Sequence, residues 1–168
     1  MIHIGEAFEG DGANAAHINL ILGPKSALGS AFALAAASPG PGHIPFLAVV
    51  KPNLPAKPST LFVAKAVLRD ERHERMTWGP AQAGVAAGIT EALLARVLPE
   101  AADDDWLAIA LVWVDWNADD AEAVYRNNRL ATRTAAERAL AAGWPDRAAL
   151  AEGLASVGNP FFTPGSAS

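Results

Sequence analysis

The longest unbroken apolar stretch of the chain runs from Trp106 to Val114 and is followed at once by Asp115. It is far shorter than the ~20 residues with which a helix crosses a bilayer, so it does not predict a membrane span. Apolar side chains on both faces are typical of a strand that is covered on each side. The stretch therefore predicts a central strand of a β-sheet.

The segment 16–22 alternates with the period of a β-strand. Its even-numbered residues are all apolar and fall on one face, whereas His17 and Asn19 fall on the other. Gly23 and Pro24 end this strand, and Pro24 suits the first turn of a helix. We therefore expect the polar pair to point away from the core.

The remaining elements are predicted from the same periods and from turn signals. Strands are expected at residues 2–8, 44–50 and 60–68, and helices at residues 24–37, 79–97, 117–141 and 147–154. The charged segment 69–75 is expected to be a solvated connection, and the proline-rich segment 51–58 an ordered loop or a linker. Because strands and helices interleave, we predict an α+β fold, a single two-layer sheet-and-helix domain over residues 1–157 with a C-terminal tail at 158–168.

Composition restricts the classes of function that remain. The chain has no cysteine, which excludes a disulfide framework and a cysteine nucleophile. Its net charge is -5, and it has no basic block of the kind that nucleic-acid binding requires. The N-terminus has neither the basic nor the hydrophobic region of a signal peptide. We expect a cytoplasmic protein that binds small ligands or protein subunits, without a nucleic-acid or membrane partner.

The common catalytic and metal-binding motifs do not occur. No two of the four histidines have the spacing that places metal ligands on one helix face, so we predict no metal site. The turn at residues 23–26 lacks the glycine-rich loop of a phosphate site, and there is no Gly-x-Ser-x-Gly elbow and no dinucleotide fingerprint. The usual hydrolase and dehydrogenase readings therefore have no support in the sequence.

Three polar residues are candidates for chemistry, and each has a structural alternative. His17 titrates near neutral pH and lies beside a glycine-rich turn, but an exposed polar position on an amphipathic strand is the alternative. Lys65 lies in an apolar strand, where desolvation would lower its pKa, unless it extends into solvent from an edge strand. Gln82 could bind a ligand or complete the first turn of its helix.

Four short motifs occur in a fixed order along the chain. They are Gly5-Glu6-Ala7 with Gly10-Asp11-Gly12, Ala16-His17-Ile18 before Gly23-Pro24, Pro52-Asn53-Leu54-Pro55 with Lys57-Pro58, and Gly79-Pro80-Ala81-Gln82. Together they closely resemble the formaldehyde-activating enzyme family. The similarity continues more weakly to Ala131-Thr132-Arg133 and covers roughly residues 2–141.

The resemblance implies an enzyme that condenses formaldehyde with tetrahydromethanopterin to give methylene-tetrahydromethanopterin and water. It implies a homopentamer of subunits with the fold of ribosomal protein S5 domain 2, and no bound cofactor besides the pterin co-substrate. His17 matches the general acid, which would protonate the carbinolamine hydroxyl before it leaves as water. The positions that match pterin contacts are Asn19, Leu47, Lys65, Val67 and Gln82. Some members continue into a hexulose-phosphate synthase domain, which we do not expect in a chain of this length.

Three positions depart from the family pattern, and they suggest a divergent paralogue. Asn19 replaces an aspartate, which removes a carboxylate that could orient the pterin or favour protonated His17. Val67 replaces a threonine, so a ligand loses a hydroxyl partner at a cost of ~1–3 kcal/mol if that ligand group is buried. Ala56 replaces a cysteine. The alternatives are a non-catalytic paralogue that binds or senses formaldehyde, a pterin or another metabolite, and a condensation on another amine such as tetrahydrofolate.

Overall fold

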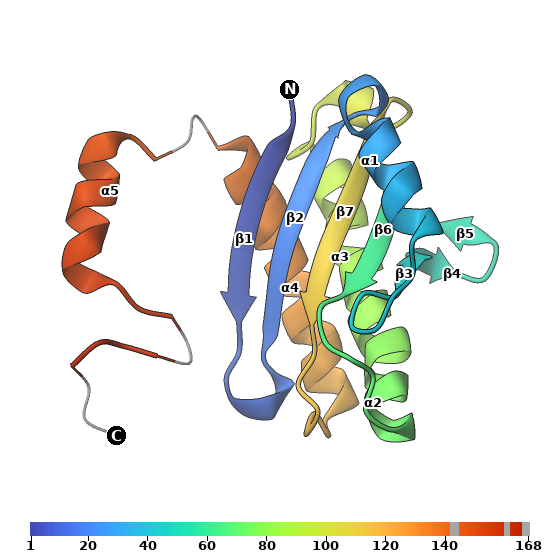
Figure 1. Ribbon diagram of the computed structural model, residues 1–168. Coiled ribbons are helices and arrows are strands. Elements are labelled where there is room, and N and C mark those ends of the chain that lie inside the picture. Colours follow the sequence, from blue (N-terminus) through green and yellow to red (C-terminus); the bar gives the residue numbers. More distant parts are fainter. Residues whose placement is uncertain (142–144, 160–161, 166–168) are drawn as a thin grey trace.

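The computed structural model describes residues 1–141, 145–159 and 162–165. Five strands form one mixed sheet in the order β1-β2-β7-β6-β3 (Figure 1). Their bounds are His3–Glu9 for β1, Ala16–Pro24 for β2, Trp106–Trp113 for β7, Ser59–Ala64 for β6 and Pro45–Leu47 for β3. β6 and β7 run parallel, and every other neighbouring pair is antiparallel. The predicted strand at Trp106 is therefore the middle strand of the sheet.

Helices cover both faces of this sheet, although unequally. The long helices α3 (Gln82–Leu94) and α4 (Ala121–Leu140) pack on one face, and α1 (Lys25–Ala37) packs on part of the other (Figure 1). The smaller elements are α2 (Glu71–Met76), α5 (Arg147–Gly153) and a two-stranded sheet of β4 (Val49–Lys51) and β5 (Leu54–Pro55). The predicted α+β class is confirmed, and α1 adds cover to the second face.

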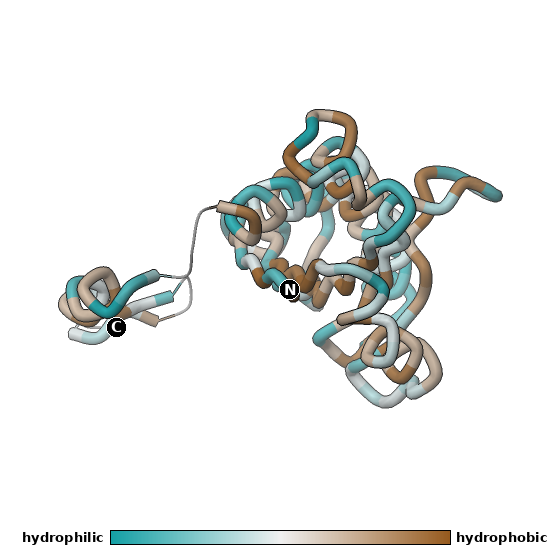
Figure 2. Tube along the Cα trace, turned by 90° about the horizontal axis from the view of Figure 1, so that it is seen from above, coloured by the Kyte–Doolittle hydropathy of each residue, from teal (hydrophilic) through white to brown (hydrophobic). Residues whose placement is uncertain are grey.

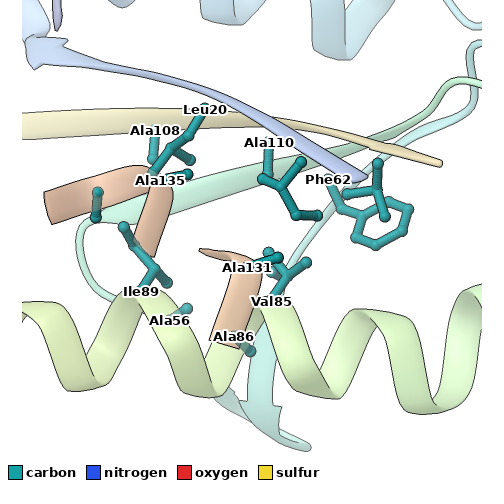
Figure 3. Packing of buried hydrophobic residues seen from close by; sticks show 14 of the residues in the cluster. Leu20, Ala56, Phe62, Val85, Ala86, Ile89, Ala108, Ala110, Ala131 and Ala135 are labelled. Carbon is teal, nitrogen blue, oxygen red and sulfur yellow. The ribbon is translucent and has the colours of Figure 1, made fainter. Parts of the chain in front are cut away.

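The period-two pattern of the strands separates two apolar clusters. On the α3–α4 side, Leu20 and Ala110 pack against Val85, Ile89 and Ala131 (Figure 3). On the α1 side, a smaller cluster is formed by Leu28, Leu61, Val63, Leu107 and Ile109. Each fully buried Leu or Ile side chain stabilises the fold by ~1.5–3 kcal/mol relative to an exposed one.

Two predictions near the helices are wrong, and capping explains both. The segment 69–75 is not a solvated connection, because it contains α2, whose first turn is capped by the Asp70 carboxylate accepting from the His73 amide at 2.9 Å. The His73 ring is buried, and its Nε2 lies 3.1 Å from the Val114 carbonyl. The helix predicted from residue 117 begins instead at Ala121, because Asp120 caps the amide of Ala123.

Other boundaries shift by a few residues. The strand predicted at 44–50 is divided between β3 and β4, and the strand predicted at 60–68 ends at Ala64. A π-helical turn, Thr77–Ala81, precedes α3. The predicted boundary between a domain at 1–157 and a tail at 158–168 stays a prediction, and residues 160–161 and 166–168 of that tail lie outside the described residues.

The segment that carries α5 stands apart from the sheet and its helices in both views (Figures 1 and 2). Within the described residues, no helix combines the length and the hydrophobicity that crossing a membrane would require.

The contact between α3 and α4 depends on two glycines. A Cβ atom on Gly88 would lie 2.4 Å from the Arg129 carbonyl oxygen, and one on Gly84 would lie 2.5 Å from the Tyr125 carbonyl oxygen. Backbone cannot yield as a flexible side chain can, so any side chain here must push the two helices apart. The two glycines of α3 thus allow close packing of the helices.

Replacing Gly88 with alanine is expected to lower the free energy of unfolding by ~1–3 kcal/mol, because the added methyl overpacks the contact between α3 and α4. Gly29 in α1 is the matched control, since nothing lies within 4 Å of a Cβ built there. Gly29→Ala is expected to stabilise the protein by up to ~1 kcal/mol through helix propensity. Urea denaturation of the two variants measures both effects, and equal stability of the two variants would contradict this packing.

Candidate active site

The polar face of β2 forms the centre of the candidate site. Because Ile18 and Leu20 are fully buried on the α3–α4 side, the alternation of the strand directs His17 and Asn19 to the opposite face. The antiparallel register places Glu6 of β1 opposite Asn19, and Trp113 of β7 opposite His17. The expected direction of the polar pair is confirmed.

Glu6 holds one side of the His17 ring. Its Oε1 lies 2.9 Å from His17 Nε2, on a diagonal across the β1–β2 pair. Arg138 of α4 reaches around the edge strand and donates to the Glu6 carbonyl oxygen at 2.8 Å. The Glu6 carboxylate is an acceptor only, so His17 Nε2 carries the hydrogen in this contact.

Lys65 contacts the other side of the same ring. Its backbone amide donates to the Val112 carbonyl at 2.8 Å, which continues the pairing of β6 with β7 by one residue. Its Nζ donates to Asn19 Oδ1 at 2.8 Å and lies 3.4 Å from His17 Nδ1. Four side chains from three separate segments thus form one polar cluster: Glu6, His17, Asn19 and Lys65.

The cluster shifts two pKa values downward. Partial burial, followed by the nearby Lys65 charge, lowers the pKa of His17 below its ordinary value, and the Glu6 carboxylate opposes this shift. Burial lowers the pKa of Lys65 to about 8, again against the attraction of Glu6. Asn19 is neutral and therefore contributes no charge that would hold Lys65 as an ammonium. Both groups can consequently exchange protons near neutral pH.

Leu47 and Gln82 lie at another edge of the sheet. They line an open, mostly apolar pocket of about 410 Å³, together with Ile44, Pro45, Phe46, Val49 and Trp78. The Gln82 side-chain oxygen accepts from the Val49 amide at 2.5 Å, so its amide nitrogen is the part of the side chain that could serve a ligand. Leu47 is 53% exposed, although it belongs to the sheet.

The structure does not bring all six predicted residues together within one chain. From β2, which carries His17, to β3, which carries Leu47, there are three strand spacings, or roughly 14 Å. Val67 follows β6 and is 53% exposed, and its carbonyl accepts from Trp116 Nε1 at 3.0 Å. The polar cluster and the apolar pocket are therefore two separate groups.

Sequence reasoning missed the role of Glu6. The residue appears in the Gly5-Glu6-Ala7 motif, but its contact with His17 depends on the register of β1 against β2. The signal that could have located it is the hairpin turn at residues 10–15, because the length of such a turn sets the register.

Proton transfer is the chemistry that the polar cluster supports directly. It contains a carboxylate, an imidazole and an amine in contact, with a neutral amide as a hydrogen-bond acceptor. Among the described residues, no group of three His, Asp or Glu side chains lies close enough together to hold a metal ion.

Comparisons with known proteins identify relatives of the whole folded region. The family model described as "Formaldehyde-activating enzyme (Fae)" matches residues 4–162. The chain is 38% identical over 162 residues to the 5,6,7,8-tetrahydromethanopterin hydro-lyase of Methanosarcina barkeri, and the match covers 94% of this chain and 89% of that protein.

Longer relatives match over the same region. The bifunctional enzyme Fae/Hps of Methanoculleus marisnigri is 43% identical over 83% of this chain, and that of Archaeoglobus fulgidus is 39% identical over 82% of it. The matched regions are only 36% and 35% of those two proteins. The family model and the identity over nearly the whole chain agree with the motifs around His17 and Gln82. This chain belongs to the formaldehyde-activating enzyme family.

Proposed function

We propose that this protein is a lyase of the 5,6,7,8-tetrahydromethanopterin hydro-lyase type. It condenses formaldehyde with tetrahydromethanopterin to give methylene-tetrahydromethanopterin and water. The observation that carries the assignment is the His17 imidazole, held between Glu6 and Lys65 on an exposed face of the sheet. The family match and the hydro-lyase relative support it.

The reaction requires protons to move from nitrogen to oxygen. An amine of the pterin adds to the carbonyl carbon, and neutral His17 passes the N–H proton of that amine to the oxygen, which gives the carbinolamine. His17 then takes up a proton from solvent and donates it to the hydroxyl as a general acid, so that water leaves. A second pterin nitrogen closes the methylene bridge and releases its N–H proton. A lowered His17 pKa suits this exchange, because the ring must be neutral before it accepts the proton.

The pterin is proposed to contact both groups of residues. Asn19 and Lys65 supply polar contacts beside His17, and Val67, which follows β6, is proposed to supply a further contact. Leu47 and Gln82 supply an apolar wall and an amide at the pocket of about 410 Å³, which falls within the range of small-molecule sites. Holding the amine and the aldehyde together supplies the remaining acceleration.

We also propose the homopentamer that the resemblance implies. The separation between His17 and the pocket at Leu47 supports self-association, because a neighbouring subunit could bring its own pocket to the polar cluster. The half-buried strand face around His17 is the proposed site of this contact. A cytoplasmic location stays a prediction from the sequence.

The first prediction concerns the condensation itself. Purified protein is expected to accelerate methylene-tetrahydromethanopterin formation above the spontaneous rate. His17→Ala is expected to lower the catalysed rate ~10²–10⁴-fold, which is the usual contribution of general acid–base catalysis. Absorbance or chromatography of the pterin product, corrected for the uncatalysed reaction, measures both.

His43→Ala is the matched control, because His43 is exposed in the loop before β3 and lies outside the cluster. Its rate is expected to equal that of the unmodified protein. Absence of acceleration by the unmodified protein would reject the assignment, and pterin binding without turnover would then favour a non-catalytic carrier.

The second prediction concerns the charge balance at His17. Glu6→Gln is expected to lower the His17 pKa further, because the carboxylate is the group that raises it. Lys65→Met is expected to raise it, because a nearby positive charge is removed. NMR titration of the imidazole resonances measures both shifts. Glu9→Gln is the control on the same strand, since Glu9 contacts Thr134 of α4 instead. An unchanged pKa in Glu6→Gln would show that the contact with His17 is not formed in solution.

A further inference from the structure

We propose that Lys65 is a nucleophile that takes up formaldehyde as a covalent iminium and passes the one-carbon unit to the amine co-substrate. The transfer half of this inference rests on the proposed function. The uptake half concerns Lys65 and formaldehyde alone, and it can be tested without a pterin.

The arrangement of the cluster matches that of an activated nucleophile. Such sites place a nucleophile in contact with a base, and a third group orients the base. Here Lys65 Nζ lies 3.4 Å from His17 Nδ1, and Glu6 Oε1 lies 2.9 Å from His17 Nε2. Because Nε2 donates to the carboxylate, Nδ1 of the neutral ring is an acceptor and faces the amine.

The same contacts suit a neutral Lys65 amine. A neutral amine has two N–H groups and one lone pair, and two acceptors are present, Asn19 Oδ1 at 2.8 Å and His17 Nδ1. Both N–H groups can therefore be held while the lone pair stays free to attack. Since Asn19 is an amide and not a carboxylate, it accepts this hydrogen bond without stabilising the ammonium form.

Burial of this amine favours its reactivity near neutral pH, and the nearby Glu6 carboxylate opposes that effect. The pKa of Lys65 is lowered to about 8 by burial, with Glu6 opposing the shift. At pH 7 roughly one molecule in ten then carries the free amine, against roughly one in 2,500 for an ordinary lysine. The other three lysines differ: Lys57 is paired with Asp103 and Asp104, Lys25 donates to the Asp104 carbonyl, and Lys51 is exposed on β4.

The chemistry balances without an oxidant or a reductant. The Lys65 nitrogen attacks the carbonyl carbon, and a proton moves from nitrogen to oxygen to give the carbinolamine Lys65–NH–CH2–OH. His17 takes up a proton from solvent and donates it to the hydroxyl. The C–O bond breaks, water departs, and the iminium Lys65–NH⁺=CH2 remains. An amine of the co-substrate then adds to the CH2 group. Its proton passes to the lysine nitrogen, and the bond from Lys65 to carbon breaks to leave the iminium on the co-substrate and the free lysine.

An iminium is a stronger electrophile than formaldehyde, which is largely hydrated in water. Forming the iminium on the protein divides the condensation into two easier steps, the reaction of Lys65 with formaldehyde and the transfer of the CH2 group to the co-substrate amine. Such a division is the general advantage of covalent catalysis. His17 performs the proton transfer already assigned to it, now also on the carbinolamine of Lys65.

The test is reductive trapping with no pterin present. The full-length protein at pH 7 is treated with one equivalent of formaldehyde and cyanoborohydride, which reduces an iminium to a methylamine. The protein is then digested with a protease that does not cleave at lysine. Mass spectrometry of the peptides measures the methylation of each lysine over time. Lys65 is expected to be methylated at least tenfold faster than Lys51, because its larger free-amine fraction outweighs its partial burial.

Asn19→Asp is the informative variant, because it preserves the shape of the side chain and adds a carboxylate beside Lys65 Nζ. It is expected to slow Lys65 methylation at least fivefold and to leave Lys51 unchanged. Asn53→Asp, at the tip of the β4–β5 hairpin, makes the same charge change away from the cluster and is expected to leave the rate of Lys65 methylation unchanged. The inference is overturned if Lys65 is methylated no faster than Lys51. It is also overturned if Asn19→Asp leaves the rate of Lys65 methylation unchanged.

Failure of this inference differs from failure of the proposed function. If Lys65 is trapped but the pterin condensation is not accelerated, the uptake half stands and the proposed function fails. If condensation is accelerated but Lys65 is not trapped, the pterin amine attacks formaldehyde directly and Lys65 only binds substrate.

Discussion

Burial of one face of β2 is the constraint on which the candidate active site depends. Ile18, Leu20 and Leu22 are fully buried on the α3–α4 side, and this fixes His17 and Asn19 on the other face. A slip of one residue in the register would reverse every side chain of the strand, so burial of three large residues strongly opposes it. The core therefore positions the polar cluster although no core residue contacts a substrate.

The cluster shows how a small sheet can alter the acidity of two bases. Lys65 and His17 are both partly buried, and each loses hydration that would stabilise its charged form. The Lys65 charge lowers the His17 pKa as well, and the Glu6 carboxylate opposes this shift. The result is an imidazole that favours its neutral form and an amine of which roughly one molecule in ten is neutral at pH 7. Proton exchange between nitrogen and oxygen requires groups of this kind.

Local pattern predicts some of these features, and tertiary contacts decide the others. The alternation in residues 16–22 was sufficient to place His17, and the apolar stretch from Trp106 was sufficient to place β7. The charges of segment 69–75 predict a solvated connection, but His73 is buried and contacts the Val114 carbonyl just beyond β7, a contact that only the fold creates. The contact of Glu6 with His17 depends on the register of β1 against β2, which the sequence does not show. The distance of Leu47 from His17 depends on the order of the strands in the sheet.

The central claim is that the cluster around His17 transfers a one-carbon unit to a pterin amine. The most direct test of this transfer is a rapid-mixing experiment. Protein that has been preloaded with one equivalent of formaldehyde is mixed with tetrahydromethanopterin, and product formation is followed over time. We expect a fast phase of methylene product whose amplitude approaches the concentration of loaded protein, and we expect His17→Ala to lose this phase. Product that forms only at the spontaneous rate, with or without His17, would contradict it.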